Sequence, residues 1–336
     1  MRNQGLLKTN NRNLVILIAA FAAVYLLWGS TYLAIKYAIE TLPSFLMAGV
    51  RFVFAGVVLM IWARFTKDYE TPKASHWKTS FIVGTLLLLG GNGGVVFAQH
   101  YISSSLAALL VATEPFWIVL LSWLWLGKSR PNLKTILGIA VGFFGVWMLI
   151  NGQTANNAAN VGSMQFFGAI AVMAAAMCWA IGSIYGLRAP VPKSAILSAG
   201  MQMFAGGSVL LVVSLVTGEM AEFNISQVSA NSVYGLIYLI ICGSLIGFTA
   251  YSWLLKNANP STVSTYAYVN PVVAVFLGWL IAGESFTGQM LVGAAVIVGS
   301  VVLITSPDDD EDSEEKIEIH QSNMPTGTPK TLSASA

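Results

Sequence analysis

Apolar residues are grouped along this chain into blocks of about 20, and short polar segments separate the blocks. A helix rises ~1.5 Å per residue, so a block of this length crosses the ~30 Å hydrocarbon core of a bilayer. The pattern predicts an all-α membrane protein with ten transmembrane helices. The expected spans are 14–36, 43–65, 79–98, 104–126, 132–151, 162–187, 194–217, 231–255, 262–282 and 287–305.

A polar segment near the middle of the chain, NGQTANNAANV, separates the first five spans from the last five. We therefore expect two five-helix repeats joined by a linker. The expected parts are a cytoplasmic N-terminus (1–13), a first repeat (14–151), a polar linker (152–161), a second repeat (162–305) and a cytoplasmic tail (306–336).

The tail differs in composition from the rest of the chain, because it carries eight acidic residues between Asp308 and Glu318. Such a segment cannot bury enough apolar surface to fold, so we expect it to be disordered. Its simplest interpretation is a solvated tail with no specific role.

Composition narrows the classes of function. Only 10% of residues are charged and 56% are hydrophobic, whereas an ordinary soluble domain carries roughly 25% charged residues. Cys178 and Cys242 lie inside apolar blocks, which favours buried small residues over a disulfide framework. The three histidines are scattered, and no GxxxxGK[ST] phosphate loop is present. The sequence predicts no enzyme activity, no cofactor, no metal site and no nucleic-acid partner.

The distribution of Lys and Arg predicts the orientation of the spans. With the N-terminus in the cytoplasm, fifteen of the 17 basic residues fall in cytoplasmic segments, Lys36 falls outside and Arg51 falls within a span. Both termini are therefore expected in the cytoplasm of a bacterial-type inner membrane.

The two halves repeat one another. SLAALLVATEPFWIVLLSWLWLGKS (105–129) aligns with STVSTYAYVNPVVAVFLGWLIAGES (261–285), GSTY (29–32) with GSIY (182–185), and AGVRFVFAG (48–56) with AGMQMFAGG (199–207). Because each half has an odd number of spans, the second must enter the membrane with inverted topology. Inverted repeats are typical of secondary transporters, which bind substrate near the midplane at the repeat interface.

The ten spans in two halves, together with WGSTY, AGVRF, LSWLWLG and YAYVNPVVAVFLGWLIAGE, resemble the EamA-type drug/metabolite transporter superfamily over about 14–305. The resemblance implies a ten-span inner-membrane exporter or permease of small metabolites without an ATP-binding module. It also implies a cavity among spans one to four and six to nine. The chain departs from the family's Leu-Gly-Glu pattern, because Gly283-Glu284 ends the ninth span and Gly127-Lys128 ends the fourth.

Arg51 and Glu114 are the two charged residues deep within the predicted spans. A charge at mid-bilayer costs ~2.5–3.5 kcal/mol on insertion scales, so such residues indicate function or pairing. Both lie about 12–15 Å from the outer surface at ~1.5 Å per residue, and we expect them to meet. The repeat aligns them with Gln202 and Asn270. We expect all four residues to line the cavity.

Two functional interpretations of the charged residues stay open beside a structural one. Glu114 exchanges a proton and couples export to proton entry, or Arg51 holds a substrate carboxylate while Glu114 takes an amine, as in an amino acid. The structural interpretation is a permanent ion pair that fixes helix packing.

Pro115 and Pro271 each remove a helix hydrogen bond and are predicted hinges, with fixed kinks as the alternative. Tyr32 and Tyr185 are predicted gates, although tyrosines are also enriched at both membrane surfaces.

Four further residues are candidates for the cavity wall. Trp28 and Trp179 either line it or pack against lipid and core. Asn92, within GGNGG (90–94), and Tyr266 are expected to face it.

The sequence thus predicts a secondary transporter of small metabolites, such as amino acids or drug-like compounds, working by alternating access with protons as a candidate second partner. It is expected to be a monomer or a weak homodimer in the lipid bilayer. An uncoupled facilitator or channel is the alternative, and a membrane-embedded enzyme is the weaker one.

Overall fold

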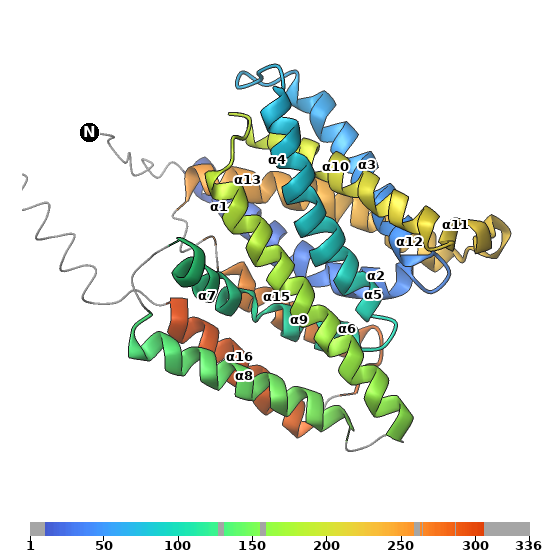
Figure 1. Cartoon of the computed structure of the whole chain (residues 1–336), viewed down its shortest axis with the longest axis vertical. Helices are drawn as coiled ribbons and strands as arrows, with labels where there is room; N and C mark the ends of the chain where they lie inside the picture. Colours follow the sequence, from blue (N-terminus) through green and yellow to red (C-terminus); the bar gives the residue numbers. More distant parts are fainter. Residues whose placement is uncertain are drawn as a thin grey trace, which may run out of the picture. The chain divides into compact units, whose positions relative to one another are not determined.

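A computed structural model describes residues 11–126, 131–154, 159–258, 263, 265–285 and 287–305, and the secondary structure in these ranges is helical (Figure 1). This confirms the all-α prediction. Within these described ranges, seven helical stretches are long and apolar enough to cross a membrane, and three shorter apolar helices accompany them, Leu133–Leu149, Tyr266–Leu280 and Gly288–Ile304. The predictions for residues 1–10, for Gly127-Lys128 and for the tail after Thr305 lie outside the described residues.

The elements follow the order of the predicted spans. The helices are α1 (Asn11–Ala23), η1 (Val24–Trp28), α2 (Gly29–Ala38), α3 (Ser44–Ala63), α4 (Ala74–Gly84), η2 (Thr85–Gly93), α5 (Gly94–Ala98), α6 (Ser104–Val111), α7 (Glu114–Leu126), α8 (Leu133–Thr154), α9 (Ala159–Arg188), α10 (Ala195–Val216), α11 (Glu219–Glu222), η3 (Ile225–Gln227), α12 (Ala230–Tyr238), η4 (Leu239–Ile246), α13 (Gly247–Asn257), α15 (Tyr266–Leu280) and α16 (Gly288–Thr305). Helices α8 and α9 extend into both ends of the predicted linker.

Three spans change helix type partway through the bundle. The segments η1, η2 and η4 are π-helical, and α-helix continues on either side of each. π-Helical turns leave backbone groups less regularly paired and are frequent at functional sites. Each of the three segments contributes residues to the central cavity described below.

The two predicted proline hinges differ. The fourth span is interrupted at Ala112 and Thr113, so that α7 begins at Glu114 and Pro115 lies in its first turn. Proline is tolerated there, because the first-turn amides of a helix have no intrahelical partner. Pro271 instead lies inside the continuous helix α15. Pro115 therefore lies beside a break in the fourth span, whereas Pro271 lies within the described, uninterrupted residues of α15.

Helices α3 and α10 pack directly against one another in antiparallel directions (Figure 1). A methyl group added at Gly56 would lie 2.8 Å from the Gly200 carbonyl oxygen, and one at Gly207 would lie 2.7 Å from the Val53 amide nitrogen. Only glycine lets two backbones approach this closely. This contact joins the second span of each half.

Helices α8 and α16 form a second antiparallel pair. The Gly138 face of α8 contacts Ile304, and Gly145 contacts Ile297. Gly142, one turn after Gly138 on the same helix, faces Ser300 of α16 in this contact.

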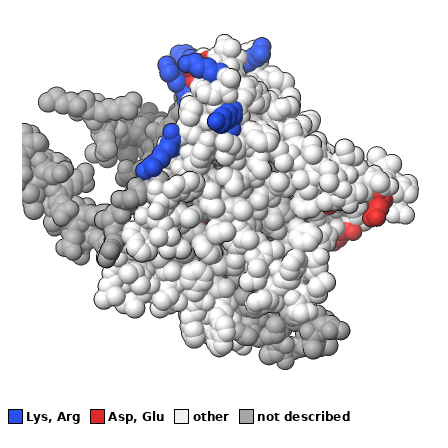
Figure 2. Space-filling view, in the orientation of Figure 1, with Lys and Arg blue, Asp and Glu red and all other residues white. Residues whose placement is uncertain are grey.

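Large apolar side chains cover much of the bundle's exterior, and Figure 2 shows that most of the visible described face carries no charge. In water such a surface would be unfavourable, whereas lipid is as apolar as these side chains. Examples are Phe54, Ile61, Leu137, Phe144, Trp147, Val212, Leu215 and Leu291.

Candidate functional site

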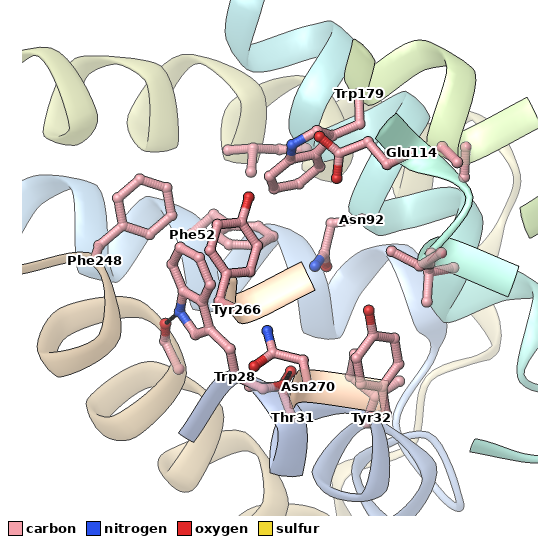
Figure 3. Close-up of a pocket in the computed structure, with 18 of the residues that line it drawn as sticks. Trp28, Thr31, Tyr32, Phe52, Asn92, Glu114, Trp179, Phe248, Tyr266 and Asn270 are labelled. Atoms are coloured by element: carbon pink, nitrogen blue, oxygen red, sulfur yellow. Dashed lines mark hydrogen bonds between the residues drawn. The ribbon is translucent and has the colours of Figure 1, made fainter. Parts of the chain in front are cut away.

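A cavity of about 130 Å³ lies inside the bundle (Figure 3), with room for a small organic molecule and water. Both halves of the chain line it. The lining residues are Trp28, Thr31, Tyr32, Ile35, Arg51, Phe52, Leu88, Gly91, Asn92, Val95, Val111, Glu114, Ala175, Ala176, Trp179, Gly243, Phe248, Tyr266 and Asn270. They come from spans one to four, six, eight and nine, and the described residues of spans five, seven and ten do not contribute.

Eight of the twelve residues singled out from the sequence line this cavity. They are Trp28, Tyr32, Arg51, Asn92, Glu114, Trp179, Tyr266 and Asn270. In Figure 3 the Glu114 carboxylate lies beside the Trp179 indole on one side of the space, and Tyr32 and Asn270 lie across from them.

The expectation that Gln202 lines the cavity is wrong for this structure. Its backbone packs against Gly84 of α4, and its side-chain Nε2 donates to Ser198 Oγ at 3.1 Å. The close contact of α10 with α3 and α4 turns this face of α10 away from the cavity. Tyr185 lies elsewhere as well, in a separate depression that it shares with Trp125 and Arg188. Pro115 and Pro271 are also outside the lining.

The expected ion pair between Arg51 and Glu114 is not formed between these two described side chains. Arg51 Nε instead donates to Ser244 Oγ at 2.9 Å, and its guanidinium carbon lies 4.6 Å from the centre of the Phe52 ring. Equal depth in the membrane does not by itself bring two side chains into contact. Both charges line the cavity, and Arg51 takes a different partner there.

Aromatic rings form one wall of the cavity. The Trp28 ring lies 5.1 Å from Tyr251, 5.3 Å from Tyr266 and 5.7 Å from Phe248, measured between ring centres. The Trp28 Nε1 donates to the Gly243 carbonyl at 3.1 Å (Figure 3). Such rings bind apolar groups, and their faces attract cations.

Two buried polar atoms at the cavity lack a hydrogen-bond partner among the described residues, Arg51 Nη1 and Asn92 Oδ1. Asn270 differs, because exchanging its side-chain oxygen and nitrogen lets the nitrogen donate to the carbonyls of Tyr25 and Tyr266 at 3.2 and 3.3 Å. A buried group left without a partner costs about 1–3 kcal/mol. The unpaired donor and acceptor therefore favour a polar ligand in this space.

A network around Glu284, in the connection between α15 and α16, joins segments of both halves at one end of the bundle. Lys36 Nζ donates to Glu284 Oε1 at 3.0 Å, and Ser104 donates to the same oxygen through its amide at 3.1 Å and its hydroxyl at 2.7 Å. The amide and hydroxyl of Ser105 donate to Oε2. The carboxylate thus caps the N-terminus of α6, where a negative charge is favoured.

Burial alone would raise the pKa of Glu284, but the hydrogen bonds from Ser105, Ser104 and Lys36 and the Lys36 charge together hold it below the usual value of 4.5. Glu284 is therefore ionised at neutral pH and keeps its role as acceptor.

A second carboxylate at the same end, Glu219, accepts from the amides of Phe45 and Leu46 at the start of α3. Nearby, Ser44 Oγ lies 2.7 Å from His100 Nε2. Burial lowers the pKa of His100 below its usual value, and the charge of Glu219 opposes this shift.

Sequence reasoning missed Ser244, Gly243, Phe248 and Tyr251. The first two occur in CGSLIG (242–247), whose small residues in an apolar span give no signal of a polar role. Glu284 was noticed only as part of the Gly-Glu ending of the ninth span, and its partners lie 179 residues or more away in the sequence.

Among the described residues no three His, Cys, Asp or Glu side chains form a group that holds a metal ion. A guanidinium, a carboxylate, two amides and an aromatic wall instead suit an amphipathic molecule that carries polar groups at separated positions.

Comparisons with known proteins agree with this geometry. A model of the EamA-like transporter family matches residues 14–151 and 166–306. The chain is 36% identical over 295 residues to the "Uncharacterized inner membrane transporter YedA" of Escherichia coli K12, covering 88% of this chain and 92% of the relative. It is 27% identical to "Protein PecM" of Dickeya dadantii over 280 residues, which covers 82% and 88% of the two chains.

Two further likenesses extend over most of the chain. The "Uncharacterized transporter YoaV" of Bacillus subtilis is 24% identical over 292 residues, 87% of this chain and 97% of the relative. A solved structure titled "Crystal structure of protein" has a TM-score of 0.57 and 20% identity, and the match covers 88% of this chain and 98% of the other. This likeness shows similarity of the fold alone.

Both the family match and the YedA relative extend over the helices that enclose the cavity. The chain belongs to the EamA-like transporter family and is an integral inner-membrane transporter of small molecules.

Proposed function

We propose that the protein is a secondary transporter that exports a small amphipathic metabolite by alternating access through the central cavity. It crosses the membrane ten times, as two inverted five-helix repeats, with both termini in the cytoplasm. The observation that carries the proposal is that residues of both halves line one cavity inside an apolar bundle. Substrate sites of inverted-repeat transporters lie at this interface.

Reciprocal contacts support the inverted repeat. The sequence aligns Gly49 with Gly200 and Met60 with Leu211, 151 residues apart in each case. Gly49 packs on Leu211, and Gly200 packs on Met60. A two-fold axis that exchanges the halves turns the first of these contacts into the second.

The same exchange relates two other helix pairs. Near Gly247 and Gly235, the eighth span packs on Trp28 and Ala34 of the first. Near Gly182, the sixth span packs on the third at Leu86. The first span corresponds to the sixth and the third to the eighth. The two-fold axis therefore turns the pair of spans one and eight into the pair of spans six and three.

The network around Glu284 supports alternating access. The positive-inside pattern assigns this end of the bundle to the outer side of the membrane. Lys36 and Ser104 of the first half bind Glu284 of the second half there, which closes the outer end in this conformation. Export requires these contacts to separate so that substrate leaves outward.

The unpaired charges support a role in binding and coupling rather than in fixing helices together. Glu114 faces the cavity without an Arg51 counter-ion, so it is available to exchange a proton or to bind a substrate amine. Arg51 is available for a substrate carboxylate. In the binding role an amino acid satisfies both groups, and in the coupling role proton entry through Glu114 supplies the driving force for export.

Overexpressing cells tested against toxic metabolite analogues identify the substrate class through gained resistance. Purified protein in vesicles then tests coupling: we expect accumulation against a gradient, and an uncoupler abolishes it. Downhill movement alone indicates a facilitator. A Glu114→Gln variant is expected to lose the pH dependence of transport, and an unchanged pH dependence removes the proton role.

A further inference from the structure

The Arg51 guanidinium is held at one edge and left free at another. Its Nε donates to Ser244 Oγ at 2.9 Å, whereas Nη1 has no partner among the described residues. Arg51 is 4% exposed and Ser244 is fully buried. Among the described residues, a single hydrogen bond donated to a neutral hydroxyl therefore orients this buried cation at the cavity wall.

The surroundings of Arg51 preserve this free edge. The centre of the Phe52 ring lies 4.6 Å from the guanidinium carbon, and a methyl group added at Gly243 would lie 3.0 Å from Nη2. Glycine at 243 thus leaves space beside the cation. A buried charge without a hydrogen-bonded counter-ion is strongly unfavourable. A ligand that supplies the negative charge removes this cost, which favours its binding.

The residues around the free edge define the chemistry of that ligand. A guanidinium binds carboxylates and phosphates through parallel N–H bonds. Arg51 is the one basic residue in the described lining, so the site matches a single negative charge better than a phosphate dianion. Trp28, Tyr266 and Phe248 supply an aromatic wall for the rest of the molecule.

We propose that Arg51, oriented by Ser244 and given space by Gly243, forms a subsite for the carboxylate of the transported molecule, which also carries an apolar or aromatic group. This inference rests on the proposed function and names the substrate class of the same cavity. Arg51 contacts the ligand, and Ser244 acts through Arg51 as a positioning residue.

The test measures binding to the full-length purified protein by thermal unfolding. The probes are phenylacetate, 3-phenylpropionate and hexanoate, their three amides, and phenylphosphonate. We expect at least one carboxylate to raise the unfolding midpoint at concentrations about tenfold or more below those its amide needs. Phenylphosphonate is expected to be weaker than the matching carboxylate.

Variants assign this preference to the subsite. Arg51→Gln is expected to abolish the carboxylate effect, Ser244→Ala to weaken it about tenfold, and Ser244→Thr, which keeps the hydroxyl, to restore it. Gln202→Ala, outside the cavity, serves as the matched control and leaves it unchanged. If Arg51→Gln does not fold, the test compares how strongly Ser244→Ala and Ser244→Thr prefer the acid over its amide. A preference that is weaker in Ser244→Ala and restored in Ser244→Thr supports the subsite, and an equal preference overturns it.

Three results overturn the proposal: amides bind as well as acids, carboxylate binding survives Arg51→Gln, or no probe gives an Arg51-dependent shift. Phosphonate preference assigns the subsite to phosphates and rejects the carboxylate. The assay requires no transport, so a failure of export in vesicles leaves the subsite standing. Conversely, loss of acid preference leaves a transporter with another substrate class.

Discussion

Lys36 Nζ and Glu284 Oε1 lie 3.0 Å apart and join the end of the first span to the connection after the ninth. The Lys36 side chain is 36% exposed and the Glu284 side chain 7%, so the ion pair faces water on the lysine side only. Ser104 and Ser105 enclose the same carboxylate at the start of α6. Three segments are therefore tied to one nearly buried charge.

We predict that Glu284→Gln loosens this closure, because a neutral amide loses the ion pair and cannot accept equally at both positions. Hydrogen bonds to charged groups contribute about 1.5–3 kcal/mol each, so we expect a stability loss of about 1–3 kcal/mol in thermal unfolding. Glu222→Gln, in the short helix α11, is the control and should change little. Equal stability of both variants would contradict the role of Glu284.

The closure should also respond to pH in a defined direction. The pKa of Glu284 is held below 4.5 in the folded protein, so its stabilising contribution is complete above the unfolded value and is lost as pH falls through the lower folded value. The difference in unfolding midpoint between wild type and Glu284→Gln should stay constant from neutral pH to about pH 5 and shrink below it. A difference that grows on acidification would refute this assignment.

Gly56→Ala is predicted to destabilise the bundle, because its methyl group would lie 2.8 Å from the Gly200 carbonyl oxygen and force α3 and α10 apart. Overpacking of this kind costs about 1–3 kcal/mol. Gly299→Ala in α16 is the matched control, since a methyl group there has no neighbour within 4 Å. Thermal unfolding in detergent compares the two, and similar midpoints would argue against a close α3–α10 contact.

Trp28→Phe tests the link between η1 and η4. The change keeps an aromatic ring beside Tyr266 but removes the Nε1 hydrogen bond to the Gly243 carbonyl, which is worth about 0.5–1.5 kcal/mol. We expect the stability of the protein to fall by this amount. We also expect a raised KM for transport, because Gly243 lies beside Arg51. Trp279→Phe, on an exposed part of α15, should alter neither quantity.

Helical character and eight of the nineteen lining residues were predictable from the sequence. Arg51 and Glu114 stand out because charges are rare in apolar blocks, and both line the cavity. Asn92 and Tyr266 were found by the same reasoning, as polar groups that lipid would not solvate. A polar or charged residue inside an apolar span can be recognised from the sequence of that span alone.

Relationships between spans were not predictable in the same way. Depth suggested that Arg51 meets Glu114, but the partner is Ser244, 193 residues away. The repeat suggested that Gln202 mirrors Arg51, but α10 turns that face toward Gly84. Rotation of a helix about its axis depends on neighbours such as Gly200 and Gly207, whose contacts are distant in sequence.

Locking the outer end of the bundle tests the central claim most directly. The Tyr37 hydroxyl lies 3.4 Å from the Ile281 carbonyl oxygen, so a Tyr37→Cys/Ile281→Cys pair, in a chain with Cys178 and Cys242 replaced by Ala, can be joined by a short reducible crosslinker. Transport in vesicles should fall to background when the pair is crosslinked and return on reduction. Transport that continues at the same rate through the crosslinked protein would contradict alternating access by this route.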